Sequence, residues 1–454
     1  MINFQIKELA TYYDPFYTYS LFENQIDSIF LDSSKEDKLL SKYSFIGLNP
    51  YRKFSSKGRH VLIDNEEYKD VDPFEKIEKL LEEYKINFDN DIPFISGAIG
   101  YFSYDIGRII EDLPDNSEED FSIPDSIFIF FDNLIIFDVQ NKKTYITAVG
   151  QIEAAEKSIS NIEMRLKDYN EENEKSEIKV ETSNNKFFSN FNKKEYEKSI
   201  SSLKDYIRNG DVYIANMTRR ILCDNNEDSF KIYERLRRIN KAPFSAYMNF
   251  KEFQIISSSP ERFLSITDGL VQTRPIKGTR PRGRNPEEDE KNKNELINSE
   301  KDKSELLMIV DLERNDLSKV CKPSSVKVTE LFKLEEYETV FHLVATIEGE
   351  LKENVSSVKC IRECFPGGSI TGAPKIRAME IIEELEKLKR NIYTGSIGYF
   401  DLRGNSDFNI VIRTIVKKGN KAYVGVGGGI TWESIEEEEW FETIDKAKAL
   451  MGVL

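Results

Sequence analysis

Hydrophobic and polar residues alternate over short stretches in the first third of the chain, a pattern typical of strands in a sheet. Two apolar runs, 127–131 and 134–137, flank the turn-forming pair Asp132-Asn133, and a third run, 144–149, follows a second turn. Parallel neighbours need a connection of about a dozen residues or more, so strands this close together must pair antiparallel. The pattern predicts a β-rich first region in which Asp132-Asn133 forms a hairpin turn.

Helical spacing of the apolar residues follows this region. It predicts a helix over about 152–169. The next residues, 170–185, are rich in Glu, Asn, Ser and Lys, as exposed linkers are. We therefore place a boundary there, between an N-terminal region, 1–185, and a second region, 186–454.

Glycine-rich stretches occur at four places. The segments 97–102 and 395–400 read Gly-Ala-Ile-Gly-Tyr-Phe and Gly-Ser-Ile-Gly-Tyr-Phe, which indicates strands approached closely by another backbone, or alternatively an internal duplication. The segment 367–375 lacks the Gly-Lys-Ser/Thr ending of a phosphate loop, so a nucleotide is not indicated. The segment 425–429 would let backbone N–H groups approach a ligand, although a tight strand end gives the same pattern.

Two pairs of acidic residues have the spacing of neighbours on a helix. Asp302 and Glu305 lie in a predicted helix over about 286–308, and Glu439 and Glu442 repeat the spacing near the C-terminus. If the two helices converge, their carboxylates offer the hard oxygen ligands that Mg²⁺ prefers. The alternative is a solvated face, because the second pair belongs to a run of four glutamates.

Lys277 ends a short segment bounded by proline and glycine and is followed by Arg280, Arg282 and Arg284. Neighbouring positive charge and burial both disfavour the charged form of a lysine, and a neutral amine is a nucleophile. The sequence therefore makes Lys277 a candidate catalytic residue. A solvated basic edge is the alternative interpretation.

Composition restricts the possible partners. The 454 residues include 64 Lys and Arg against 80 Asp and Glu, a net charge of −16 that argues against nucleic acid and against an anionic membrane surface. Four cysteines and two histidines, with no CxxC pair and no His cluster, indicate neither zinc nor a disulfide framework. The first twenty residues lack an apolar signal core and no apolar run approaches the length of a membrane span, so we expect a cytoplasmic protein.

Six motifs, taken in order, closely resemble those of the chorismate-binding enzymes, and the resemblance covers nearly the whole chain. It implies an α+β fold like that of anthranilate synthase component I, with two packed antiparallel β-sheets and helices on the outer faces. It also implies that the substrate is chorismate. The motifs are SSPERF at 258–263, PIKGT at 275–279, ELLMIVDLERND at 305–316, GAPK at 372–375, IVIRT at 410–414 and GGGI at 427–430.

The resemblance also assigns roles to residues at matching positions. It implies Mg²⁺ as the cofactor, bound by Glu305 and Glu442, with Glu439 and Asp302 holding waters around the ion. In the members that work with an amidotransferase, the early part of the chain forms a tryptophan pocket, and the matching positions here are Ser33, Ser34, Tyr43 and Ser44. The groups implied in substrate binding are Arg413, Tyr393, Thr371, Gly427, Gly428, Gly429 and His342.

Two positions separate the reactions of this family. Isochorismate and salicylate synthases activate water with a lysine where this chain has Ile214, a side chain that cannot accept a proton. The amidotransferase-linked members usually have glutamine there, so Ile214 departs from their pattern too. Anthranilate synthases have a small alanine at the position of Lys277, whereas aminodeoxychorismate synthases have the lysine. Lys277 therefore favours the second reaction, in folate biosynthesis.

The mechanism implied by the resemblance begins with addition of the Lys277 amine to ring C2 as the C4 hydroxyl, protonated by Glu261, departs. Ammonia then attacks C4 and expels Lys277. We expect the ammonia to come from a separate glutaminase subunit, because the chain has no Gly-x-Cys-x-Gly turn. The alternatives are anthranilate synthase component I and a non-catalytic homologue that binds tryptophan.

Overall fold

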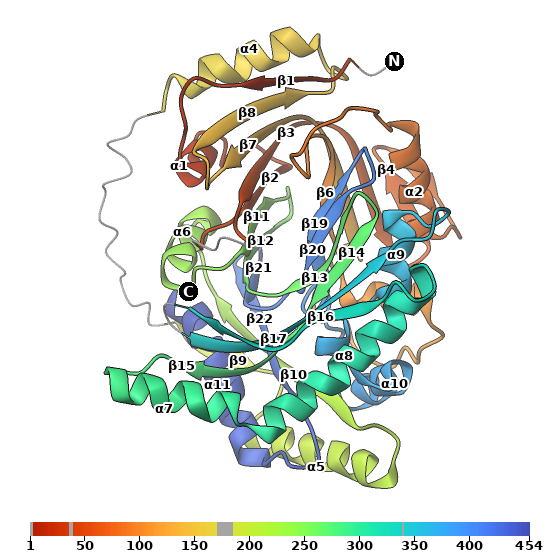
Figure 1. Cartoon of the computed structure of the whole chain (residues 1–454), viewed down its shortest axis with the longest axis vertical. Coiled ribbons are helices and arrows are strands. Elements are labelled where there is room, and N and C mark those ends of the chain that lie inside the picture. The colour runs from red at the N-terminus through yellow and green to blue at the C-terminus, as the bar shows by residue number, and fades with distance from the viewer. Residues whose placement is uncertain (1–2, 36–39, 170–184, 338–339) are drawn as a thin grey trace.

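Two antiparallel layers of strands, joined through two long strands, form the centre of the molecule (Figure 1). The computed structural model describes residues 3–35, 40–169, 185–337 and 340–454. Its 22 strands form one hydrogen-bonded network, and every ladder between the described strands is antiparallel. The long strands β3 (Tyr43–Lys57) and β7 (Ser126–Asp138) belong to both layers.

The first layer contains the strands that pair with the first half of β3 or the second half of β7, and those beyond them. In order they are β9 (Phe187–Ser189), β10 (Ile214–Asp224), β22 (Lys421–Ile430), β21 (Thr414–Lys418), β12 (Phe253–Ser259), β11 (Phe244–Asn249), β2 (Ser28–Asp32), then β3 and β7, β8 (Lys143–Ala148) and β1 (Gln5–Glu8), with β18 (Gly372–Ala373) also paired to β10.

The second layer contains the strands that pair with the other halves of β3 and β7. In order they are β5 (Glu66–Tyr68), β4 (His60–Ile63), then β3 and β7, β6 (Gly97–Phe102), β19 (Ser396–Asp401), β20 (Ser406–Asn409), β13 (Arg262–Thr267), β14 (Leu270–Arg274) and β17 (Val340–Glu350), with β15 (Ile276–Pro281) and β16 (Lys327–Glu336) also paired to β17.

The predicted hairpin turn at Asp132-Asn133 is wrong, because β7 runs straight through both residues. Their polar groups bond to neighbouring segments instead: Asn133 Oδ1 accepts hydrogen bonds from Asn49 Nδ2 on the adjacent strand at 2.7 Å and from Ser158 Oγ, outside the sheet, at 2.8 Å. The residues that face the inter-layer core change from 127, 129 and 131 to 134 and 136 across this pair. Asp132-Asn133 therefore marks the point where β7 passes from one layer to the other.

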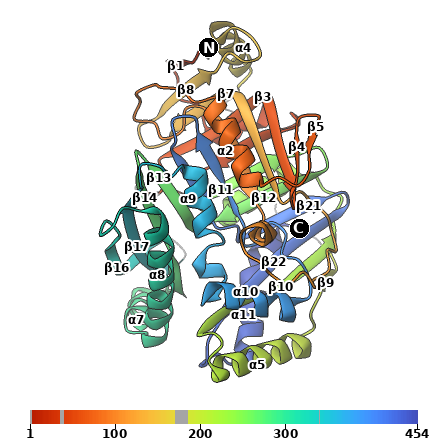
Figure 2. The same cartoon turned by 90° about the vertical axis from the view of Figure 1, so that its right-hand side faces the viewer.

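Helices cover the outer faces, as the resemblance implies. Aliphatic and aromatic side chains between the layers form one core, and three further cores lie beneath the helices. Figure 2 shows α2 and α9 one above the other on the face turned to the viewer. The helices are α1 (Pro15–Ser20), α2 (Pro73–Glu83), α3 (Gly107–Ile110), α4 (Ala155–Leu166), α5 (Lys193–Asn209), α6 (Ser229–Ile239), α7 (Pro286–Ile297), α8 (Glu300–Val320), α9 (Ser357–Cys364), α10 (Lys375–Glu386) and α11 (Glu436–Gly452).

Strands from both sides of the predicted boundary pair with each other. β2 pairs with β11 and β6 with β19, so the regions 1–185 and 186–454 share both layers, and the boundary itself stays a prediction. Most of the predicted linker, 170–184, lies outside the described residues. The two similar glycine segments lie side by side, with Gly100 opposite Gly398. A Cβ on Gly100 would lie 1.9 Å from the Ile127 carbonyl oxygen, so the expected close approach is confirmed.

Two helices replace the single helix expected over 286–308. α7 ends at Ile297 and α8 begins at Glu300, because the Ser299 hydroxyl accepts the Asp302 N–H at 3.2 Å and starts a new helix. The helix predicted over 152–169 is confirmed as α4. None of the helices within the described residues is both long and apolar enough to span a bilayer.

Replacing Asn133 by alanine should destabilise the fold. Asn49 and Ser158 would lose their acceptor in a fully buried site, at a cost of about 2–3 kcal/mol. Denaturant unfolding of Asn133→Ala measures the loss. Asn161→Ala is the control, because its side chain makes one exposed hydrogen bond, to Glu153, and its loss should change stability by less than about 0.5 kcal/mol. Equal effects of the two substitutions would contradict this account of β7.

Candidate active site

A cavity of about 1000 Å³ lies where the ends of both layers meet α8 and α11. Most of the residues singled out in the sequence line it, although they come from segments up to 181 positions apart, from 261 to 442. They are Glu261, Lys277, Asp302, Glu305, His342, Tyr393, Arg413, Gly427, Gly429, Glu439 and Glu442.

Lys277 lies on β15 and points across the cavity to the other layer. Its Nζ donates a hydrogen bond to the Ser369 carbonyl at 3.1 Å and lies 3.5 Å from where a Cβ on Gly429 would be. Ile214 packs against the same glycine, with Cδ1 at 3.2 Å. A larger residue at 429 would therefore displace the amine or the isoleucine.

The arginines that follow Lys277 are directed at acids of α7 and α8. Arg280 pairs with Asp302 at 3.0 Å, and Arg282 pairs with Asp289 at 2.6 Å. The expected crowding of Lys277 by these cations is therefore not what the fold produces. The charged groups that respond to the Lys277 ammonium are acids, and it lowers the pKa of three of them: Glu261, Glu305 and Glu442.

Glu261 occupies the turn between β12 and β13 and is buried. Burial raises the pKa of its carboxyl group, an effect opposed by a hydrogen bond with the Ser369 side chain and by the Lys277 charge. Ser369 therefore contacts both candidate catalytic residues, one through its side chain and the other through its carbonyl. The net increase favours a carboxyl group that keeps a proton, as a general acid requires.

The four predicted metal-binding acids meet on one side of the cavity, but lysine occupies part of their coordinating capacity. Glu442 forms an ion pair of 2.5 Å with Lys446, which outweighs burial and lowers the pKa of Glu442. Burial raises the pKa values of Glu305 and Glu439. Among the residues that the structure describes, no three His, Cys, Asp or Glu side chains form a ready-made metal site.

The donor set nevertheless fits a hard divalent cation. A Cβ on Gly428 would lie 3.2 Å from Glu439 Oε2 and 3.3 Å from Glu442 Oε1. Both carboxylates therefore come together beside a residue that has no side chain. Glu305 and Asp302 approach from α8, although Asp302 also accepts a hydrogen bond from Arg280. Carboxylates on two helices, together with open space for water and substrate, match the requirements of Mg²⁺.

Arg413 and Tyr393 also form part of the cavity wall. Arg413 has a left-handed backbone conformation, with φ of 53°, and donates a hydrogen bond to the Lys446 carbonyl. Burial lowers the pKa of Arg413 and raises that of Tyr393. A Cβ on Gly425 would lie 2.2 Å from the Tyr393 ring, so glycine is required for the ring to pack flat against β22. A buried guanidinium and a phenol hydroxyl can together bind a carboxylate.

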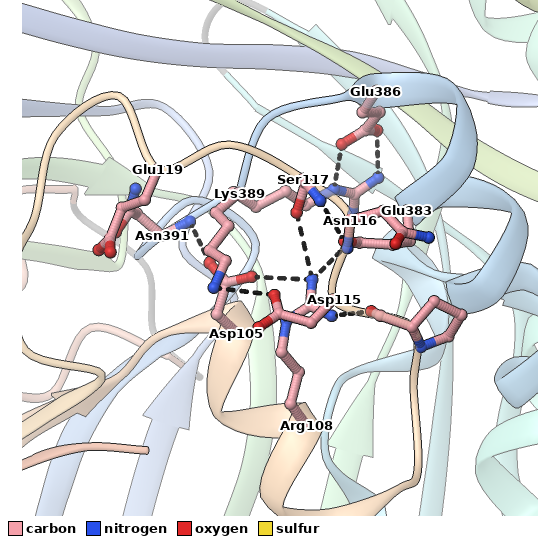
Figure 3. A network of polar contacts seen from close by, with 12 residues as sticks. Asp105, Arg108, Asp115, Asn116, Ser117, Glu119, Glu383, Glu386, Lys389 and Asn391 are labelled. Carbon is pink, nitrogen blue, oxygen red and sulfur yellow. Dashed lines mark hydrogen bonds and ion pairs between the residues drawn. The ribbon is translucent and has the colours of Figure 1, made fainter.

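A buried polar network behind this wall fixes the segment that carries Tyr393 (Figure 3). Arg390 forms an ion pair with Glu386 at 2.6 Å and donates to the carbonyls of Asn216 and Ile370 at 2.6 and 2.9 Å. The Asn391 N–H donates to Asp105 at 2.7 Å. These bonds tie the end of α10, β10 and the loop before β18 together, so that the cavity wall is held from outside.

His342 and Thr371 differ in how they are placed. His342 lines the cavity, and its Nδ1 lies 2.9 Å from the Thr279 hydroxyl. Burial, reinforced by the Lys35 charge, lowers the pKa of His342 to about 4. Thr371 is fully buried behind the wall, and its hydroxyl donates to the Gly367 carbonyl at 2.9 Å. Its role in substrate binding stays a prediction, as does that of Gly428.

A second cavity, of about 350 Å³, lies between β2, β3 and β19. Ser33 and Tyr43 line it, together with apolar residues that include Phe45. Ser34 and Ser44 do not line it: the Ser34 hydroxyl donates to the Ala242 carbonyl, and Ser44 Oγ accepts the Ser33 N–H at 3.0 Å. Two of the four predicted residues are thus brought to one cavity, which Arg262 and Asp407 also line, and tryptophan binding there stays a prediction.

Two of the cavity residues that sequence reasoning missed bind predicted site residues directly. Lys446 follows Glu442 by four positions, and this ion-pairing spacing on a helix was an available signal. Ser369 has no such signal, because its two contacts, with Lys277 and with Glu261, cross from one chain segment to another.

The chain is similar in sequence and in structure to known proteins of one family. The sequence matches the family described as chorismate binding enzyme over residues 27–452. Anthranilate synthase component 1 of Acetivibrio thermocellus is 36% identical, covering 97% of this chain and 92% of that protein. Aminodeoxychorismate synthase component 1 of Bacillus subtilis (strain 168) is 38% identical, covering 91% and 89%. The crystal structure of anthranilate synthase component I from Streptococcus pneumoniae TIGR4 has a TM-score of 0.82 at 30% identity, covering 92% and 94%. The expected fold is therefore confirmed.

His342 should remain neutral far below the usual range of histidine. Its imidazole signals in NMR spectra should titrate with a midpoint near pH 4, and the chain has only one other histidine, so His60→Gln assigns them. Because the folded pKa is depressed, the contribution of His342 to stability is present above pH 6.5 and is lost as the pH falls toward 4. A midpoint close to 6.5 would contradict the buried, lysine-facing placement.

Proposed function

The chain belongs to the chorismate-binding enzyme family, and we propose that within it the chain is an aminodeoxychorismate synthase component I. It would convert chorismate and ammonia to 4-amino-4-deoxychorismate through a covalent intermediate on Lys277. The observation that carries the proposal is the position of the Lys277 amine, inside the cavity, hydrogen-bonded to the Ser369 carbonyl and close to the acid Glu261.

Substrate binding would use the two carboxylates of chorismate. Arg413 and Tyr393 are suited to the enolpyruvyl carboxylate, because one supplies a buried positive charge and the other a hydroxyl donor. The glycines of β22 let the ring approach the backbone without a side chain in between, and Gly427 and Gly429 line the cavity. The acids of α8 and α11 face the other end, where the ring carboxylate needs a cation between it and them.

Glu305 and Glu442 would hold that cation, with Glu439 and Asp302 around it. When bound, Mg²⁺ would supply positive charge for the ring carboxylate and relieve the repulsion among the acids. Lys446 and Lys301 balance part of this negative charge in the protein itself, since both lower the pKa of Glu442.

The reaction itself needs one acid and one nucleophile. The hydrogen bond from Lys277 Nζ to the Ser369 carbonyl fixes the nitrogen, and once the ammonium has released a proton to solvent its lone pair would add to ring C2. Glu261, whose pKa is raised by burial, would give its proton to the departing C4 hydroxyl, which leaves as water. Ammonia would then attack C4 and expel the Lys277 amine, restoring the ring. Ile214 leaves no side chain at its position able to activate water instead.

Ammonia would come from a separate glutaminase, for which the chain has no nucleophile turn of its own. The relatives' names, component 1, agree with an enzyme built from more than one component. The chain alone should therefore use ammonium and not glutamine.

Anthranilate synthase component I is the second candidate, because a relative of that name is 36% identical over nearly the full chain. It would leave Lys277 without a covalent role.

The products distinguish the two candidates. Incubated with chorismate, ammonium and Mg²⁺, the chain should release 4-amino-4-deoxychorismate, and 4-aminobenzoate should form only when an aminodeoxychorismate lyase is added. Chromatography with mass detection identifies both compounds. Fluorescent anthranilate without any lyase would assign the second candidate instead.

Removing the amine should stop the reaction. Lys277→Met should lower kcat with saturating ammonium by at least about a hundredfold, because the nucleophile is lost while the cavity is kept. Intact-protein mass spectrometry should trap a ring adduct on the native chain and none on the variant. Lys251→Met is the control, since this exposed lysine lies outside the residues that line the cavity. An undiminished rate in Lys277→Met would exclude the covalent route.

A further inference from the structure

Two buried acids on α8, Glu313 and Asp316, lie one turn apart but have different partners. Asp316 pairs with Lys375 at 2.6 Å and with Lys319 at 3.0 Å. Within the part of the chain that the structure describes, no ion pair involves Glu313. The charged groups that face Glu313 are Asp316, Lys375 and the carboxyl group of Glu261.

The hydrogen bonds around Thr273 can accommodate a proton on Glu313. Thr273 Oγ1 lies 2.7 Å from the Phe263 carbonyl oxygen and 2.9 Å from Glu313 Oε2. A hydroxyl group has one hydrogen and can donate it fully to only one of these acceptors. If the hydrogen goes to the Phe263 carbonyl, the second contact is satisfied only when the carboxyl group of Glu313 donates. The pair of distances therefore fits a neutral, protonated Glu313.

The position of Glu313 connects it to the catalytic acid. Thr273 belongs to β14, and its other partner, Phe263, follows Glu261 by two residues on β13. On its other side Glu313 packs against the loop that carries Ser369, because its Cγ lies 3.6 Å from where a Cβ on Gly368 would be. Glu313 thus lies beneath the two segments whose contact brings Glu261 to Ser369.

We propose that Glu313 is a positioning residue that stays protonated at neutral pH, donates its proton to Thr273 and thereby holds Glu261 against Ser369 and Lys277. The part of this inference that concerns catalysis rests on the proposed function, in which Glu261 is the acid. The protonation itself is a property of the fold and does not depend on which reaction the cavity performs.

Loss of the Glu313 proton lowers the stability of the folded protein as the pH rises. Burial raises the pKa of Glu313 from 4.5 to about 8. The unfolded chain releases the proton above pH 4.5 and the folded chain only near pH 8, so the stability contribution is complete below 4.5 and is lost as the pH rises to 8. Over that interval the folding equilibrium constant should fall about tenfold per pH unit from this one site. Ionised Glu313 would also place a second negative charge behind Glu261.

The experiment compares Glu313→Gln with Asp311→Asn, a control at an exposed position of the same helix, where the side chain pairs with Arg314. Infrared difference spectra of the native protein should contain a carbonyl band of a protonated carboxyl group that disappears with a midpoint near pH 8. This band, as distinct from any band of Glu261, should be absent in Glu313→Gln and present in Asp311→Asn. The loss of stability between pH 5 and 8 should be smaller in Glu313→Gln than in the native protein.

Activity gives the second readout. The alkaline limb of kcat/KM with chorismate should move upward by about one pH unit or more in Glu313→Gln and should keep its position in Asp311→Asn. A limb that does not move in Glu313→Gln would overturn the positioning role, and absence of the infrared band at pH 6 would overturn the protonation. Should Glu313→Gln fail to fold, Thr273→Val decides: the band must shift in frequency because the proton loses its acceptor, and an unchanged band overturns the proposal. Failure of the proposed reaction would leave the infrared and unfolding results intact, so the two failures are distinguishable.

Discussion

The approach of Lys277 on β15 to Gly429 on β22 is the constraint on which the cavity depends, because these strands belong to different layers. The amine reaches the backbone of the opposite layer only while the two layers keep their spacing. β3 and β7 maintain that spacing, since each runs through both layers, and Asp132-Asn133 is held inside β7 by buried hydrogen bonds. The contact between Lys277 and Gly429 in the cavity thus depends on β3 and β7, which run without a break elsewhere in the molecule.

The charged side chains that line the cavity have different local surroundings. The chain as a whole is acidic, yet its cavity contains acids and lysines side by side, and in this low-dielectric site each carboxyl group responds to its own partner. Lys446 lowers the pKa of Glu442, whereas burial dominates at Glu261 and Glu305. Residues of one chemical type can therefore serve as an anionic ligand in one place and as an acid in another.

Prediction from the sequence failed where a residue's partners in the fold are not its neighbours along the chain. The arginines after Lys277 were expected to act on it because they are its neighbours along the chain. The fold pairs Arg280 with Asp302 and Arg282 with Asp289 instead. Neither acid is an immediate neighbour of its arginine along the chain. Asp132-Asn133 has the composition of a turn, but its side chains bond to Asn49 on β3, Ser158 on α4 and Gln151 after β8, which local sequence rules do not include.

The sequence by itself determined the family, the antiparallel fold and eleven of the residues that line the cavity, because ordered motifs and glycine positions record requirements of the local backbone. Only the tertiary structure decided which of these groups meet. Ser369 contacts both Lys277 and Glu261, and Glu313 lies beneath them, through side chains that are distant along the chain. Protonation was also decided there, since burial and the nearest charge, which no linear pattern contains, set the pKa of each group.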